Sequence, residues 1–244
     1  MTCSKDPSCY KNPATADFED MMSKLGIEND DRIIIYDRLA SRLSTRLYWT
    51  LKYYGHEQVQ ILDGGINAWA AGFKLSNVVR KATASNYKVT VTDDNILAEM
   101  KLVEEKFQDP KARLVDGRPP EQYSGKVAGR IFHTGQEHAR KGHIPGAVNV
   151  FWQDNFNKDG TFKSAEELAA LYKKDGVLPD QCVITYCNEG LHAAPPWFVL
   201  TQMLDFKDVR LYDSSMAEWS ESDNPLKIVA EETKETSADK KDSK

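Results

Sequence analysis

The chain of 244 residues contains one segment twice, at a constant spacing of 150 residues and without a gap. The match rests on identical residues in the two copies, which are Gly26 and Gly176, Tyr36 and Tyr186, Val59 and Val209, Asp63 and Asp213, and Trp69 and Trp219. A spacing this regular indicates a duplicated structural unit. Both copies alternate strand-length apolar runs with helical runs, which is typical of a doubly wound, mostly parallel sheet with helices on both faces. The duplication therefore predicts two tandem α/β domains.

The spacing of apolar residues predicts the elements of each copy. In the first copy, helices are expected over 17–25, 41–54 and 66–71, with strands over 33–36 and 59–62. In the second copy, helices are expected over 96–107, 165–174, 193–204 and up to Trp219, with strands over 113–116, 183–186 and 209–212 and in the run that ends at 150. The segment 117–142 is long, basic and rich in glycine, which favours an ordered surface excursion, a loop that lies outside the core.

The composition shifts along the chain suggest the domain boundaries. We expect a partial first domain over 1–75, a linker over 76–95, a second domain over 96–229 and a disordered tail over 230–244. The counterpart of the strand at Leu114 would precede residue 1, so the first domain lacks its opening strand and turn. A sheet without that strand exposes an edge or an apolar face. This favours a truncated start, with which any targeting segment would have been lost.

Charge and cysteine content narrow the class of protein. A net charge of −5 gives no reason to expect nucleic acid or a membrane as partner, and no apolar run reaches the length of a membrane span. The first thirty residues show no signal peptide. The four cysteines are too few and too uneven for a disulfide framework. The expected compartment is the cytoplasm, or the periplasm if a targeting segment is missing from the start.

Cys187 is the residue most suited to chemistry. It ends the apolar run 183–186 and precedes a short loop and a helix that starts with paired prolines, which the first helical turn tolerates. Free N–H groups and the positive end of the helix dipole should face its sulfur and favour the nucleophilic thiolate. Its counterpart in the first copy is Asp37, so only the second copy should be chemically active. Taken alone, the loop fits a buried structural cysteine equally well.

Four motifs of the second copy belong together. They are Leu114–Arg118 with Glu121 and Tyr123, Gly142–Ala147, the strand and loop over 183–192, and Asp213–Trp219. With Gly55, His56, Leu62–Gly65 and Trp69 of the first copy, they resemble the tandem rhodanese-like sulfurtransferases, which act on thiosulfate or 3-mercaptopyruvate. The resemblance covers roughly residues 13–229.

This resemblance implies a persulfide mechanism. Cys187 would take a sulfane sulfur from a small anionic donor, thiosulfate or 3-mercaptopyruvate, and pass it to a thiol, to cyanide or to a protein acceptor such as a thioredoxin-like protein. Arg118 would bind the anionic group of the donor with its planar fork. Neither a metal nor a cofactor is implied. The loop whose amides would cradle the persulfide anion consists of Asn188, Glu189, Gly190, Leu191 and His192.

Three loop residues depart from the family pattern. Asn188 and Glu189 stand where thiosulfate-using members carry basic residues, and a carboxylate beside an anionic donor is unfavourable. Efficient use of thiosulfate is therefore not expected, and the donor stays open. His192 stands where small hydroxyl residues are usual. It could lend a proton to a leaving thiol or help the cysteine ionise, but a histidine that only caps the helix or faces solvent is slightly preferred.

Other chemistries fit less well. A cysteine phosphatase needs an arginine six positions after the cysteine, where Ala193 stands. His133, His138 and His143 lack the spacing of metal ligands on one helix face. The alternative function is a non-catalytic rhodanese-like binding module, or a sulfur carrier fed by a partner protein. Glu189 and the partial first domain favour that alternative.

Overall fold

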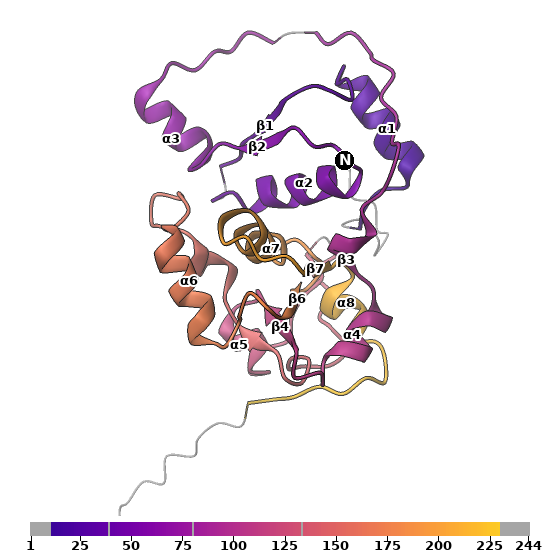
Figure 1. Cartoon of the computed structure of the whole chain (residues 1–244), viewed down its shortest axis with the longest axis vertical. Helices are drawn as coiled ribbons and strands as arrows, with labels where there is room; N and C mark the ends of the chain where they lie inside the picture. Colours follow the sequence, from indigo (N-terminus) through magenta and orange to yellow (C-terminus); the bar gives the residue numbers. More distant parts are fainter. Residues whose placement is uncertain (1–10, 39, 80, 133, 230–244) are drawn as a thin grey trace, which may run out of the picture.

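Two α/β halves lie one above the other, with the first half uppermost in Figure 1. The computed structural model describes residues 11–38, 40–79, 81–132 and 134–229, so the tail predicted over 230–244 lies outside the described residues. The first half contains α1 (Thr15–Lys24), β1 (Ile33–Ile35), α2 (Arg42–Tyr53), β2 (Val59–Ile61) and α3 (Gly65–Gly72). The second half contains η1 (Asp94–Ile96), β3 (Leu97–Ala98), α4 (Met100–Lys106), β4 (Ala112–Asp116), α5 (Pro120–Tyr123), β5 (Val148–Asn149), η2 (Trp152–Asn155), α6 (Ala165–Lys174), β6 (Cys182–Tyr186), α7 (Ala194–Phe198), η3 (Val199–Met203), β7 (Val209–Tyr212) and α8 (Ser215–Trp219).

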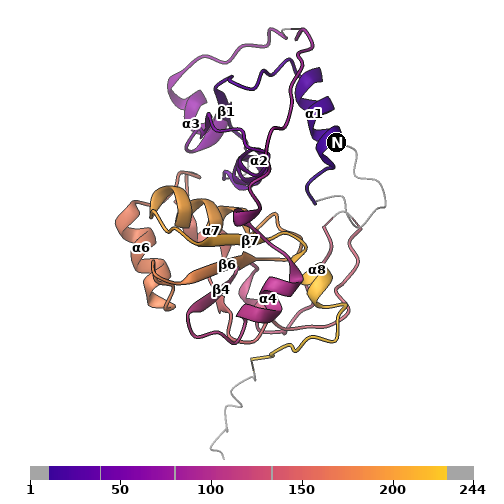
Figure 2. The same ribbon diagram turned by 45° about the vertical axis from the view of Figure 1, so that its right-hand side comes forward.

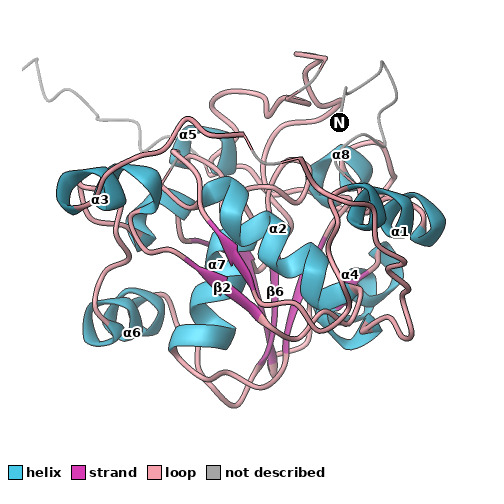
Figure 3. Ribbon diagram, turned by 90° about the horizontal axis from the view of Figure 1, so that it is seen from above, coloured by secondary structure: helices cyan, strands magenta, loops and turns pink. Residues whose placement is uncertain are grey.

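The second half is built on a five-stranded parallel sheet in the order β3-β7-β6-β4-β5. Helices lie on both sides of this sheet, as Figures 1 and 3 show. The predicted fold class is therefore confirmed. The helix expected over 96–107 is wrong at its start, because Leu97 and Ala98 pair with β7 as an edge strand and α4 begins only at Met100. Helical spacing alone does not reveal an edge strand of two residues.

The duplication seen in the sequence is a duplication of structure. β1 pairs with β2 in parallel through Ile33 and Val59, and β6 pairs with β7 in the same register through Val183 and Val209, each 150 residues later. Helix α6 likewise begins and ends 150 residues after α1. The repeat therefore preserves strand register and helix ends as well as residue identities.

The outer edge of β1 is where the two halves differ most. In the second half, β4 occupies that edge of β6, and Ile184 and Tyr186 are fully buried. Their counterparts Ile34 and Tyr36 are 57% and 56% exposed, and no strand among the described residues pairs with that edge. A groove of about 780 Å³ runs beside it. The predicted exposed edge is thus present in the first half.

Residues between the two halves run without helix or strand from Phe73 to Asp93, where the structure describes them. Tyr87 is nevertheless buried and packs edge-on against Phe18 of α1, with ring centroids 5.8 Å apart. The segment predicted as a linker is therefore anchored on the first half. The domain boundaries given above remain predictions.

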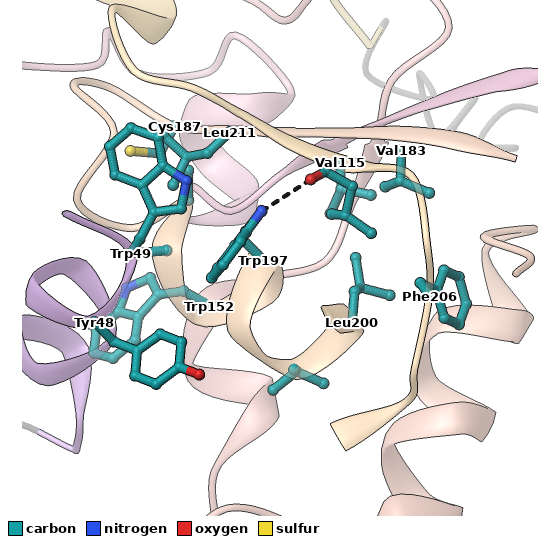
Figure 4. Packing of buried hydrophobic residues seen from close by; sticks show 14 of the residues in the cluster. Tyr48, Trp49, Val115, Trp152, Val183, Cys187, Trp197, Leu200, Phe206 and Leu211 are labelled. Atoms are coloured by element: carbon teal, nitrogen blue, oxygen red, sulfur yellow. Dashed lines mark hydrogen bonds between the residues drawn. The ribbon is translucent and has the colours of Figure 1, made fainter. Parts of the chain in front are cut away.

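The two halves share one hydrophobic core. Helix α2 of the first half lies against α7 of the second half, as Figures 1 and 2 show. Figure 4 shows Tyr48 and Trp49 of α2 beside Trp197 of α7, and the rings of Tyr48 and Trp197 lie 6.4 Å apart. Tyr48 also meets its own repeat counterpart, Phe198, edge-on at 4.9 Å. This packing places the first turn of α2 against the loop that follows β6.

Candidate active site

Cys187 lies at the carboxyl end of β6, the strand with β4 on one side and β7 on the other. Ligands of doubly wound sheets bind beyond this edge. Its Sγ accepts a hydrogen bond from the backbone N–H of His192 at 3.2 Å. Cys187 is only 1% exposed and belongs to the core drawn in Figure 4. The sulfur is thus at the predicted place, enclosed on most sides by protein.

The expectation of an easily ionised thiol is wrong for this structure. Burial raises the pKa of the Cys187 thiol above its usual value, although N–H groups of Glu189, His192 and Ala193 favour the thiolate. Asp116 raises the pKa further. The amides do converge on the sulfur as predicted, but they do not outweigh the loss of water around a buried charge.

Ser215 ties the loop to α8. Its hydroxyl oxygen accepts the N–H groups of Cys187 at 3.0 Å and of Gly190 at 3.1 Å, and its O–H donates to the carbonyl of Tyr212. Ser215 has a φ of +51°, the left-handed region that its counterpart Gly65 also adopts. A serine there is strained. In return, the Ser215 hydroxyl provides an acceptor for the N–H groups of Cys187 and Gly190.

Two glycines allow other segments to approach the loop closely. Gly190 has a φ of +80°, and a Cβ on it would lie 2.4 Å from a carboxylate oxygen of Asp213. A Cβ on Gly117 would lie 2.5 Å from the carbonyl oxygen of His192. The tight loop predicted from Gly190 is therefore present, and it is packed from two sides.

In the first half, the backbone N–H groups of the equivalent loop bind a carboxylate. There the carboxylate of Asp37, the counterpart of Cys187, accepts N–H groups from Ser41, Leu43 and Ser44 at 3.1, 2.9 and 2.8 Å. The loop conformation is thus an anion cradle, and the first half fills it with its own carboxylate. In the second half, a negatively charged sulfur would take the same place.

A cavity of about 50 Å³ opens at Cys187, enough for a few waters or one small group. The excursion 117–142 forms part of its wall: the N–H of Phe132 donates to Glu189 at 2.5 Å, and Nε2 of His138 lies 2.9 Å from Oδ1 of Asn188. The residues that line the cavity are Arg130, Phe132, Cys187, Asn188, Glu189, Leu191 and His192.

Arg118 does not line this cavity. Its guanidinium is 1% exposed and contacts both carboxylate oxygens of Asp116, with the shortest distance 2.6 Å, and its Nη2 also donates to the carbonyl of Gly142 at 2.8 Å. The structure thus uses Arg118 to join β4 to the turn at Gly142. Binding of a donor by Arg118 stays a prediction from the family resemblance, because the described residues enclose its guanidinium.

His192 is packed between the two halves. Its ring stacks on Trp152 at 5.1 Å, and its Nε2 lies 3.2 Å from Nη1 of Arg42. Since a guanidinium can only donate, Nε2 accepts and the ring proton is assigned to Nδ1. Burial and the charge of Arg42 lower the pKa of His192 to about 4, so the ring is neutral near pH 7. The preferred reading is wrong: the side chain neither caps α7 nor lies free in solvent.

Within the described ranges, no cluster of His, Cys, Asp or Glu side chains could hold a metal ion. The helices described there are also too short or too polar to cross a membrane.

The comparison with protein families decides the assignment. The model of the rhodanese-like domain matches residues 4–72 and 99–222, and so covers both copies of the repeat. The chain belongs to the rhodanese-like family. Within it, the "Sulfur carrier protein TtuD" of Thermus thermophilus is 36% identical over 88% of this chain and 76% of its own length. A "Putative thiosulfate sulfurtransferase" of Haloferax volcanii is 36% identical over 83% of this chain and 71% of its own. These names support a role in sulfur transfer.

Two solved structures share the fold of this chain. The Tum1 protein of Saccharomyces cerevisiae superimposes with a TM-score of 0.78 at 23% identity, over 89% of this chain and 76% of that one. The anaerobic ergothioneine biosynthesis enzyme of Chlorobium limicola superimposes with a TM-score of 0.79 at 23% identity, over 92% of this chain. This chain spans 59% of the length of that enzyme. At such identity the likeness concerns the fold.

Several residues at the site were not identified from the sequence. Arg42 lies 150 residues before His192, but the repeat does not say that the two touch. Ser215 lay inside a recognised motif without a role, although a serine at the position of Gly65 was a visible signal. Arg130 and Phe132 lie in a loop without periodicity, so nothing in the sequence placed them over Cys187.

Proposed function

We propose that this chain is a sulfurtransferase that carries a sulfane sulfur as a persulfide on Cys187. The observation that carries the proposal is the position of the sulfur, at the carboxyl end of β6 and inside a ring of backbone N–H groups. The carboxylate of Asp37 occupies the same kind of ring in the first half, which supports an anion as the natural occupant. A terminal persulfide sulfur is such an anion.

The chemistry consists of two displacements. The Cys187 thiolate attacks the outer sulfur of thiosulfate, a sulfur–sulfur bond forms, and sulfite leaves with the electron pair of the broken bond. With 3-mercaptopyruvate, the thiolate attacks the substrate sulfur, the sulfur–sulfur bond forms and the carbon–sulfur bond breaks. Pyruvate leaves as its enolate, whose carbon takes up the proton that the substrate thiol gives up. An acceptor thiolate or cyanide then attacks the outer sulfur of the persulfide, and the Cys187 thiolate is regenerated.

A second candidate is a sulfur carrier that is loaded by a partner protein. Glu189 lines the cavity and disfavours a free anionic donor, and burial raises the pKa of the Cys187 thiol. A partner protein that delivers sulfur by direct contact would avoid the unfavourable approach of a free anion to Glu189, and its own groups could help the Cys187 thiol to ionise. The name of the Thermus relative, a sulfur carrier, is in keeping with this second role.

Intact mass measurement distinguishes the two. The purified protein is incubated with thiosulfate or with 3-mercaptopyruvate, and the gain of one sulfur atom is followed over time. We expect the gain in the wild type and in Cys182→Ser, and its loss in Cys187→Ser. Cys182 is the matched control because it begins β6, the strand that Cys187 follows. Loading by neither donor would refute the small-donor enzyme and leave the carrier.

A further inference from the structure

Arg42 belongs to the first half but contacts the active site of the second half. It is the first residue of α2, and its guanidinium carbon lies 6.0 Å from the ring centroid of Phe132 and 5.7 Å from that of Trp152. Its Nη1 lies 3.2 Å from Nε2 of His192. Phe132 and His192 both line the Cys187 cavity. Arg42 does not itself line the cavity, but its contacts with these two lining side chains hold its positive charge beside the cavity rim.

The guanidinium of Arg42 retains an unused donor. Its Nε is buried and has no hydrogen-bond partner among the residues that the structure describes, and no ion pair of those residues involves Arg42. Two nearby arginines differ, since Arg130 pairs with Glu137 at 2.9 Å and Arg46 pairs with Asp213 at 2.5 Å. A buried donor without an acceptor is costly, so the site is suited to an anionic ligand.

We propose that Arg42 binds the anionic group of the sulfur donor at the rim of the Cys187 cavity, so that both halves of the duplication form one substrate site. The ligand class is a small sulfonate or carboxylate that carries a transferable sulfur. This deepens the proposed function and rests on it. A planar fork with a free Nε–H suits two oxygens of such a group.

Donor titrations test this proposal. The rate of sulfur loading of Cys187 is measured by intact mass against the concentration of 3-mercaptopyruvate and of thiosulfate. For Arg42→Gln we expect half-maximal loading to need roughly tenfold more donor, with the maximal rate changed less than about twofold. Arg42→Lys should recover part of the affinity. The matched control is Arg38→Gln, which removes an exposed arginine from the same half, at the outer groove.

A second measurement does not depend on sulfur transfer. The rates at which iodoacetate and iodoacetamide alkylate Cys187 are compared, because the two reagents differ mainly in charge. Arg42→Gln should lower the iodoacetate to iodoacetamide ratio several-fold, while Arg38→Gln leaves it unchanged. The control variant also shows whether loss of any positive charge has this effect.

The outcomes separate the two proposals. Equal titrations and equal alkylation ratios in wild type and Arg42→Gln would overturn the role of Arg42. An Arg42-dependent alkylation ratio in a protein that never loads sulfur would overturn the proposed enzyme and retain the anion site. A Cys187 that reacts with neither the donors nor the alkylating reagents would overturn both.

Discussion

Arg42 and His192 occupy the same position in the two copies of the repeat, and their side chains meet, with Nη1 and Nε2 3.2 Å apart. Tyr48 and Phe198 are also repeat counterparts in contact. A residue can touch its own counterpart only near the axis that relates the two copies, as at an isologous dimer interface. The Cys187 loop therefore lies beside this internal axis, and the first half, which lacks a cysteine there, packs directly behind side chains that line the site.

The main effect of Arg118→Met should be a less stable fold, and not a specific loss of donor binding. It leaves the carboxylate of Asp116, which is fully buried, without its cation, and breaking a buried pair costs about 3–5 kcal/mol. Urea unfolding monitored by fluorescence measures the free energy of unfolding. The double variant Asp116→Leu with Arg118→Met should recover part of the loss. A stable Arg118→Met protein with weakened donor binding would instead support the role expected from the resemblance.

Ser215→Ala should weaken the loop, because the N–H groups of Cys187 and Gly190 would both lose their acceptor. We expect a loss of roughly 1–3 kcal/mol in the free energy of unfolding. Ser215→Gly should cost less, since glycine relieves the strain of a φ of +51°. Urea unfolding of both variants, with sulfur loading followed in parallel, tests this order. A larger loss in the glycine variant would show that the φ of +51° does not strain the backbone at this position.

The reactivity of Cys187 should rise with pH beyond the range usual for a cysteine. Burial raises the pKa of its thiol, and only the thiolate reacts. The alkylation rate with iodoacetamide should therefore increase about tenfold per pH unit through neutral and mildly alkaline pH, without a plateau near about 8.5. Intact mass follows the reaction, with Cys187→Ser as the background. A plateau near neutral pH would mean that the amides outweigh burial after all.

Two histidines should make the fold sensitive to acid. Burial lowers the pKa of His138 to about 4, and burial with the charge of Arg42 lowers that of His192 to about 4. In the unfolded chain both pKa values return to about 6.5, so the stabilisation is complete above pH 6.5 and is lost as the pH falls toward 4. Each imidazole should contribute roughly 3 kcal/mol to this loss.

Urea unfolding between pH 4 and 7 measures the effect. His138→Gln and His192→Gln should each give a shallower decline of the free energy of unfolding with falling pH. The double variant should give the shallowest decline, because the two side chains lie on different segments. A wild-type protein whose stability does not change over this range would contradict the lowered pKa values.

The repeat and the motif around Cys187 were enough to predict the strand pairing and the position of the active-site cysteine from the sequence. Apolar periodicity and a spacing of 150 residues record local structure, so they predicted the strands that pair Ile33 with Val59 and Val183 with Val209, and the place of Cys187 at a strand end. Only the tertiary structure decided how the sulfur is enclosed, that Arg118 is held by Asp116, and that Arg42 reaches His192. The burial of a side chain and the partner of a charge depend on which helices pack together. Helix α2 packs against α7 across the two halves, and nothing in the sequence marks the residues of these two helices as neighbours in space.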